Sequence, residues 1–457
     1  MRKDEIKLDS SPRLIHAHLL SQYGSLSNFC NYECRILITN IKLLTFNAVL
    51  LDDRQDISYL RGFFQMSSVP TIRKIQLTKY KFPFNDVGYD LAFAVGPFYQ
   101  PGGKGSRTAL GIRIYTDSGV IGEYMSIAPG TFEQIQSFVS FLIGKNALER
   151  ELFYNTAKTI LRKQDRMGIG PIDIALWDLA GKEHNSPIYR LLGGHRNKLP
   201  TYASTFHADR TQGGLNSPEA FADFAQQCQE MGYQGYKIHS WGESNIKREI
   251  ETVHKVGERV GGKMALMIDP CCVYDTFAEA LAVGQACDEE NFYWYEDPMR
   301  DGGVSLFAHK QLKKMLKTPL LQGEHVHLVE AHVDMAIAGA TDFWRADPEY
   351  DGGITGVMKI AHAAEGFGMD VELHIAGPAQ RHCMAAMRNS NFYEMGLVHP
   401  KLSENIACPP VYKCGYVDQL DSIDSEGFVT VPEGPGLGVE YDWDAVAKYK
   451  TTELIVD

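Results

Sequence analysis

The chain has 457 residues, of which 44% are hydrophobic and 22% charged, values typical of a globular protein. Its length suits two or three domains, or one large barrel with an added domain. The formal net charge of −12 at pH 7 argues against nucleic acid as the main partner, because phosphate binding needs clustered Lys and Arg. A small anionic ligand is compatible with this charge, since a metal or a local lysine can make one cleft positive.

The cysteines and the apolar segments of the chain bear on where in the cell the protein is located. The nine cysteines include no CxxC pair, so free thiols in a reducing cytosol are the simplest interpretation, and no zinc ribbon or thioredoxin-type site is supported. The apolar stretch 36–51 is shorter than the roughly 20 residues that a membrane-spanning helix needs. No apolar run follows the first charged residues as in a signal peptide. We therefore expect a cytoplasmic protein with no membrane partner.

Residues 1–70 carry the weakest pattern, and we expect an N-terminal extension there that is poorly ordered or not needed for the fold. The stretch that begins at Met66, "MSSVPTIRKIQ", reads like a natural start. Whether residues 1–65 belong to the native product stays open.

Residues 71–194 combine strand and helix patterns. The stretch 72–82 alternates polar and apolar residues like a strand, and 107–126 reads as two strands joined at the hairpin signal "DSG". Helical periodicity follows over 131–163 and again over 170–194. Antiparallel strands followed by helices predict a compact α+β domain.

From residue 195 to about 415, short apolar runs alternate with helical stretches, at a spacing that suits βα units. Seven or eight such units in succession predict a parallel sheet closed into a barrel. A doubly wound open sheet is the alternative, but no glycine fingerprint follows an early strand. The stretch "GPGLG" at 434–438 resembles a phosphate loop only superficially, because no suitable helix pattern follows it.

Nearly every one of these apolar runs ends in an ionisable residue, and the carboxyl ends of barrel strands form the catalytic face. Asp269, Glu296 and Glu324 follow three consecutive runs, in "LMID", "YWYE" and "LLQGE". Each alone could cap a helix. Three carboxylates brought together repel one another unless a cation lies between them, and oxygen-only ligands suit Mg²⁺. The set therefore predicts a magnesium site.

The remaining strand ends carry acid–base candidates. Asp347 in "WRAD" and His374 in "VELHI" end adjacent strands, so the carboxylate can hold one imidazole nitrogen and leave the other for proton transfer. Glu394 in "NFYEMG" could bind a substrate oxygen, or be a buried acid satisfied by the backbone. In "GYKIHSW", Lys237 and His239 point to the same side of one strand, either as a catalytic pair or as ordinary polar residues.

The order and spacing of these motifs resemble the enolase superfamily, in its mandelate racemase-like branch, over roughly residues 73–445. The motifs for the second to eighth barrel strands are "YKIH", "MIDP", "YEDP", "QGEH", "RADPEYDGGIT", "ELHIAG" and "FYEMG", and "VPEGPGLGVE" resembles the closing segment. The resemblance implies an α/β fold with a (β/α)7β modified TIM barrel over 195–415 and an α+β N-terminal capping domain over 71–194. It also implies that a C-terminal segment, 416–457, returns to the capping domain.

The resemblance further implies roles for the strand-end residues. It implies one Mg²⁺ held by Asp269, Glu296 and Glu324, an acid/base dyad formed by Asp347 and His374 on one face of the substrate, and an electrophilic partner, Glu394, near the substrate carboxylate. Lys237 matches the first lysine of the family's Lys-x-Lys pair. His239 stands where the second lysine, usually the base on the opposite face, is expected, which leaves the identity of that base open.

Such a site implies removal of a proton next to a carboxylate. We expect a Mg²⁺-dependent dehydratase, a hydro-lyase that converts a small anionic sugar acid (an aldonate or aldarate) to a 2-keto-3-deoxy acid. A racemase, epimerase or cycloisomerase with the same residues stays open, as does a catalytically silent relative. His207, His325 and Trp241 are candidate hydroxyl-binding residues, although each could equally pack or cap. The Gly- and aromatic-rich stretch 84–103 reads as a loop, either one that closes over substrate or a plain surface loop. We also expect a homo-oligomer.

Overall fold

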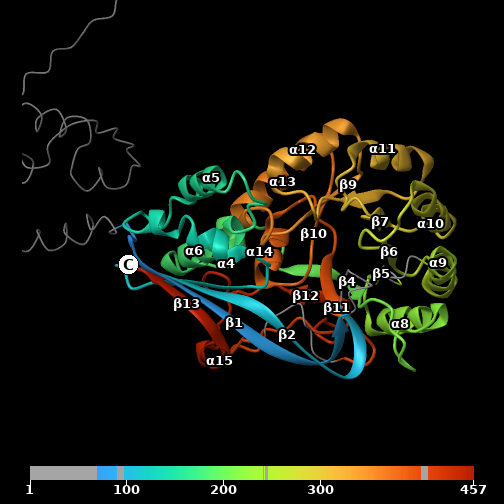
Figure 1. The fold of residues 1–457 in the computed structure, drawn as a ribbon, viewed down its shortest axis with the longest axis horizontal. Helices are drawn as coiled ribbons and strands as arrows, with labels where there is room; N and C mark the ends of the chain where they lie inside the picture. The colour runs from blue at the N-terminus through green and yellow to red at the C-terminus, as the bar shows by residue number, and fades with distance from the viewer. Residues whose placement is uncertain (1–68, 90–96, 240, 242–244, 403–409) are drawn as a thin grey trace, which may run out of the picture. The chain divides into compact units, whose positions relative to one another are not determined.

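The structure is a computed structural model that describes residues 69–89, 97–239, 241, 245–402 and 410–457 (Figure 1). The extension predicted at residues 1–70 therefore lies almost wholly outside the described residues. Within the described ranges, no helix is long and apolar enough to cross a membrane.

The N-terminal part of the described chain is built on a four-stranded antiparallel sheet with the order β13-β1-β2-β3. Its strands are β1 (Ile72–Tyr89), β2 (Pro97–Thr116), β3 (Ile121–Ser126) and β13 (Lys450–Val456). The predicted hairpin is present, with Ile114 of β2 paired to Gly122 of β3 across the "DSG" turn. The last strand of the chain pairs with β1, so the C-terminal segment lies beside the first strand.

Helices cover this sheet because one face of each strand is apolar. Ile112 and Ile114 of β2 are fully buried and belong to the same apolar core as the helices. The helices of this part are α4 (Thr131–Gln136), η1 (Val139–Leu142), α5 (Arg150–Ile160), α6 (Ile169–Glu183) and α7 (Ile188–Leu191), with α15 (Trp443–Lys448) added near the C-terminus. Antiparallel strands followed by helices confirm the predicted α+β class.

The stretch 84–103 differs from its prediction as a loop. Residues 84–89 continue β1 and residues 97–103 begin β2, and Val87 pairs with Tyr99 in a two-stranded ribbon. Residues 90–96 lie outside the described residues. The ribbon contacts the second part of the chain, since Phe98 forms a bridge with His207 and the ring of Tyr99 stacks on His399 at 4.6 Å. The cross-strand pair of Val87 with Tyr99 joins a β-branched and an aromatic residue, a combination that favours a paired ribbon over a loop.

The second part is a nearly closed barrel of eight parallel strands with the order β10-β9-β8-β7-β6-β5-β4-β11. Helices alternate with the strands, which confirms the predicted (β/α)7β fold. The elements are β4 (Lys198–Thr205), α8 (Pro218–Met231), β5 (Gly235–His239), α9 (Ile246–Val260), β6 (Ala265–Asp269), α10 (Phe277–Glu289), β7 (Trp294–Glu296), α11 (Leu306–Met315), β8 (Leu320–Gln322), α12 (Leu328–Ala338), β9 (Phe343–Ala346), α13 (Gly353–Phe367), β10 (Val371–Leu373), α14 (Pro378–Ala386) and β11 (Tyr393–Val398). A short strand, β12 (Phe428–Thr430), pairs antiparallel with β4.

Alternation along each barrel strand separates the helix-packed face from the interior. On β5, Tyr236 and Ile238 join the apolar core shared with the helices, and the Tyr236 hydroxyl donates to a carbonyl of α8. Lys237 lies level with Met267 of β6, and His239 lies level with Asp269. Met267 belongs to a separate small cluster with Tyr202, Trp294 and Leu321 that fills the interior. The polar residues at the carboxyl ends of the strands therefore lie next to this apolar layer of the barrel interior.

Helix α6 of the N-terminal part packs directly on the barrel loop that follows β9. A Cβ built on Gly170 would lie 2.3 Å from the Glu349 carbonyl oxygen and 2.5 Å from that of Pro348, so only glycine allows this approach. The Glu349 side chain in turn accepts from the Tyr124 hydroxyl at 2.9 Å and from the Ile127 backbone N–H at 3.2 Å. These contacts position the loop that carries Asp347.

Candidate functional site

A pocket of about 560 Å³ opens at the carboxyl ends of the barrel strands. It is lined by residues of both parts of the described chain: Pro97, Arg107, Ile127, His207, His239, Asp269, Cys271, Cys272, Gly302, Glu324, His325, Asp347, Glu349, Tyr350, His374, Ile375, Glu394 and Leu397. Pro97 and Arg107 come from β2, so the long ribbon supplies one wall. The pocket size suits a small-molecule ligand.

Three carboxylates converge at one side of this pocket. Asp269 ends β6, Glu296 ends β7 and Glu324 follows β8, so each comes from a consecutive strand. One oxygen from each lies within 4.8 Å of the others. Octahedral Mg²⁺ holds its oxygen ligands roughly 3 Å apart when adjacent and about 4 Å apart when opposite. The donor set and its spacing therefore fit Mg²⁺.

Two buried cations lie beside these carboxylates. Lys237, 1% exposed, places Nζ 2.9 Å from Glu296, 2.9 Å from Glu394 and 3.5 Å from Asp269. Arg345, fully buried on β9, lies 2.9 Å from Glu296 through Nε and pairs with Glu394 through its terminal nitrogen. Burial disfavours the charged form of Lys237, but Glu296 and Glu394 outweigh it and raise the lysine pKa well above its usual value.

Glu394, on β11, lines the pocket and links both cations. In addition to Lys237 and Arg345, its Oε2 accepts from the Ile375 backbone N–H at 2.7 Å. Burial favours the neutral acid, but Arg345 and Lys237 hold the Glu394 pKa well below its usual value. The carboxylate is therefore charged and fixed at the pocket wall.

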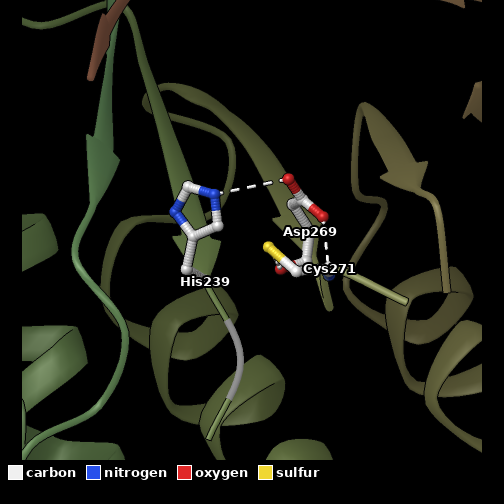
Figure 2. A group of neighbouring side chains, drawn as sticks. All are labelled: His239, Asp269 and Cys271. Carbon is white, nitrogen blue, oxygen red and sulfur yellow. Dashed lines mark hydrogen bonds and ion pairs between the residues drawn. The ribbon is translucent and has the colours of Figure 1, made fainter. Parts of the chain in front are cut away.

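His239 presents one defined nitrogen toward the metal-site carboxylates. Its Nδ1 lies 2.6 Å from the Thr205 carbonyl oxygen, which can only accept, so Nδ1 carries the proton. The other nitrogen, Nε2, lies 3.3 Å from Asp269 Oδ2, as Figure 2 shows. This backbone contact holds the proton on Nδ1 and makes Nε2 the nitrogen that faces the pocket, whereas Lys237, on the same strand face, does not line the pocket.

His374 and Asp347 form a hydrogen-bonded pair just after the neighbouring strands β10 and β9. His374 Nδ1 donates to Asp347 Oδ2 at 2.7 Å, and Nε2 lies 3.4 Å from Glu324. The Tyr350 ring lies beside the imidazole at 5.6 Å between centroids. Burial lowers the His374 pKa, but the Glu324 and Asp347 carboxylates outweigh it and raise that pKa to about 9.

The three candidate hydroxyl-binding residues differ in whether they line the pocket. His207 and His325 line the pocket. Trp241 is 4% exposed and absent from the lining, and its indole N–H donates to the Thr252 hydroxyl at 2.8 Å. Trp241 therefore packs behind β5 against α9 instead of facing a ligand.

Three residues that the structure brings to the site were not predicted from the sequence. Arg345 stands two positions before Asp347 in "WRAD", so strand alternation alone would have placed both on the interior face. Tyr350 has no such signal, because it lies in the loop after β9 and its position against His374 depends on the loop path. Arg107 is likewise brought to the pocket by the ribbon, far from the barrel motifs in sequence.

The fold and the pocket together define a barrel protein with carboxylates, histidines and buried cations gathered at the strand ends. Sequence comparison gives the family. A profile described as "Enolase C-terminal domain-like" matches residues 220–445, and one described as "Mandelate racemase / muconate lactonizing enzyme, N-terminal domain" matches residues 102–193. The chain belongs to the enolase superfamily, in its mandelate racemase-like branch.

Named relatives fall into more than one reaction class. An arabinonate dehydratase of Saccharolobus solfataricus is 27% identical over 74% of this chain and 89% of its own length. A D-galactarolactone cycloisomerase of Agrobacterium fabrum is also 27% identical, over 75% of this chain and 92% of its own. The crystal structure of a D-glucarate dehydratase from Agrobacterium tumefaciens complexed with magnesium matches with a TM-score of 0.74 and 30% identity, over 84% of this chain and all of that one.

Proposed function

We propose that this enzyme is a Mg²⁺-dependent hydro-lyase that dehydrates an aldonate or aldarate to a 2-keto-3-deoxy acid. The observation that carries the proposal is the arrangement of two histidines around one carboxylate-rich pocket. The Nδ1 of His239 is hydrogen-bonded to the Thr205 carbonyl, and that of His374 to the Asp347 carboxylate. His239 ends β5 and His374 follows β10, which are not neighbours in the barrel order. Two histidines on separate walls can serve the two proton transfers that an elimination needs, one from carbon and one to the leaving oxygen.

We assign the base role to His239. The Thr205 carbonyl keeps the proton on Nδ1, so Nε2 offers a lone pair for the proton on C2, the carbon beside the substrate carboxylate. Lys237 is the weaker candidate because its ammonium group is surrounded by Asp269, Glu296 and Glu394 and does not line the pocket. The lysine then serves as a fixed positive charge.

We assign the acid role to His374. Its Nδ1 is held by Asp347, which orients the ring and leaves Nε2 toward the pocket. Protonation of the C3 hydroxyl by Nε2–H lets water leave, and the resulting enol becomes the 2-keto-3-deoxy acid. Glu394 lies between the two cations at the pocket wall and would hydrogen-bond a protonated oxygen of the substrate.

Asp269, Glu296 and Glu324 would hold the Mg²⁺. When bound there, the ion supplies positive charge that stabilises the negative charge developing on the substrate carboxylate, usually the largest contribution in such reactions. The residues of the chain position this charge: Lys237 and Arg345 both pair with Glu296 and hold its carboxylate in place. Arg107 at the ribbon wall is a candidate for an anionic group of the substrate.

A cycloisomerase is the second candidate, because a relative of that name is as similar as the named dehydratase. Both would begin with proton transfer at the carbon beside a carboxylate. A racemase would differ only in returning a proton to that carbon.

The location of the reaction in a reducing cytoplasm is supported by the free thiols among the described cysteines.

A screen of aldonates and aldarates with Mg²⁺ in deuterated water tests the proposal. Exchange at C2 reports proton abstraction, and formation of a 2-keto-3-deoxy acid reports elimination. Product formation with at least one sugar acid, lost after chelation and restored by Mg²⁺, is expected. Exchange without elimination would favour a racemase or cycloisomerase, and neither signal from any acid would contradict the proposed reaction.

A further inference from the structure

A second set of potential metal ligands lies in the pocket, and it differs in chemistry from the three carboxylates. His239, Asp269 and Cys271 each offer one ligand atom, and these atoms lie within 4.8 Å of one another. Figure 2 shows the Cys271 sulfur turned toward the space between the imidazole and the carboxylate. The three residues come from the ends of β5 and β6, directly beside the proposed magnesium site.

A fourth donor is close to this set. The Nε2 atom of His207 lies 3.8 Å from Cys271 Sγ, and the rings of His207 and His239 are 5.2 Å apart between centroids. Two imidazoles, one thiol and one carboxylate form a donor set typical of Zn²⁺ and of other thiophilic divalent ions. Mg²⁺ prefers an all-oxygen set, so the two ions favour different ligands in the same pocket.

The distances approach those of a tetrahedral site. With bonds of about 2.0–2.3 Å, zinc ligands are separated by roughly 3.3–3.8 Å. The His239 Nε2 to Asp269 Oδ2 distance is 3.3 Å and the His207 to Cys271 distance is 3.8 Å. The ligand atoms of His239, Asp269 and Cys271 lie within 4.8 Å of one another, and His207 stands beside this group, so binding requires the two pairs to close toward each other.

The surroundings of the ligands already hold them for metal binding. The Nδ1–H of His239 donates a hydrogen bond to the Thr205 carbonyl, which is the arrangement that orients metal-binding histidines. The Cys271 backbone N–H donates to Asp269 Oδ1 at 2.7 Å, so Oδ2 remains the oxygen that faces His239. His239 and Asp269 are 6% and 4% exposed, while Cys271 is half-buried at the pocket, where an ion can enter.

We propose that His239, Asp269, Cys271 and His207 form a binding site for Zn²⁺ or another thiophilic divalent cation, distinct from the three-carboxylate site and sharing Asp269 with it. Binding releases the Cys271 thiol proton to solvent, so that the thiolate becomes the ligand. The ion takes the Nε2 lone pair of His239. Because His239 is the proposed base, binding of this ion should inhibit turnover even at saturating Mg²⁺. This inhibition rests on the proposed function, whereas the binding of the ion does not.

Cobalt gives a test of binding that needs no substrate. Enzyme stripped of transition metals is placed in buffer with excess Mg²⁺ and titrated with Co²⁺. A thiolate-to-cobalt charge-transfer band in the near ultraviolet is expected to saturate at one equivalent of cobalt. Cys271→Ser should lose the band. Cys272→Ser is the matched control, because Cys272 lines the same pocket with a similar positive φ (58° against 51°), and it should keep the band. A missing band, or one that survives in Cys271→Ser, would overturn the site.

Zinc inhibition tests the consequence. In the presence of saturating Mg²⁺, Cys271→Ser should need at least about ten-fold more Zn²⁺ for half-inhibition than the wild type or Cys272→Ser. Equal sensitivity of all three would mean that zinc acts by displacing Mg²⁺ from Asp269, Glu296 and Glu324, against the proposal. If no sugar acid is turned over, the proposed reaction fails while the cobalt band still decides the metal site.

Discussion

Replacing Arg345 with methionine tests whether one buried cation holds the carboxylates of the pocket in place. The guanidinium is fully buried and pairs with Glu296 and Glu394, whose side chains are at most 1% exposed. After the substitution, Lys237 would be the remaining cation in contact with both carboxylates. Methionine keeps the apolar stem, so the change isolates the loss of charge from the loss of volume.

The expected cost follows from burial. Breaking a buried ion pair by removing one partner costs about 3–5 kcal/mol, because the other charge stays desolvated and unpaired. Two carboxylates are affected here, which puts the expected loss in the free energy of unfolding toward the upper part of that range. With a urea dependence of about 3 kcal/mol per molar, the unfolding midpoint should fall by about 1 M or more.

The assay is urea unfolding followed by intrinsic fluorescence, with Arg388→Met as the control. Arg388 also pairs with a carboxylate, that of Glu365, but its side chain is 74% exposed and the pair should contribute little. The reasoning would be refuted by an Arg345→Met midpoint within about 0.3 M of the control. Arg345→Lys should recover part of the loss, since it restores the charge without the two-pronged geometry.

Four further predictions concern the other polar residues. His374→Asn keeps a donor for its carboxylate partner but removes Nε2, so elimination should fall at least about 100-fold while deuterium exchange at C2 persists; normal dehydration would exclude His374 as the acid. His239→Asn should lose exchange and elimination together by a similar factor, and retained exchange would exclude this histidine as the base. Glu324→Gln should weaken Mg²⁺ binding at least ten-fold in calorimetry of the substrate-free protein, and unchanged affinity would remove it from the metal site. Glu349→Ala leaves the buried Tyr124 hydroxyl without its acceptor and should cost about 1–3 kcal/mol in urea unfolding, whereas Glu349→Gln should cost less; equal losses would contradict this account.

Much of the fold could be predicted because its signals are local. Alternation predicted strands at 72–82 and 107–126 with the "DSG" hairpin, and the regular succession of apolar runs and helices predicted a closed parallel barrel, whose (β/α)7β form the family resemblance implied. Residues 84–89 and 97–103 of the stretch 84–103 were predicted wrongly as part of a loop, because its glycines and aromatic residues read as loop composition. Its pairing is decided by cross-strand neighbours, which a local reading does not supply.

The strand-end residues could be gathered from sequence for the same reason. Once the barrel is recognised, the carboxyl end of every strand faces one opening, so Asp269, Glu324 and His374 are expected near one another. Their chemical roles stay predictions for experiment. Trp241 shows the limit of this reasoning, because a position near a strand end does not tell whether the side chain faces the pocket or the helix behind it.

The sequence by itself determined the order of the elements and which residue types stand at the strand ends, because both depend on periodicity along the chain. The tertiary structure decided which atoms meet. Lys237 and His239 share one strand face, yet three carboxylates surround the lysine while a backbone carbonyl fixes the tautomer of the histidine. Those partners come from β4, β6, β7 and β11, and only the barrel arrangement of the strands brings them within hydrogen-bonding distance.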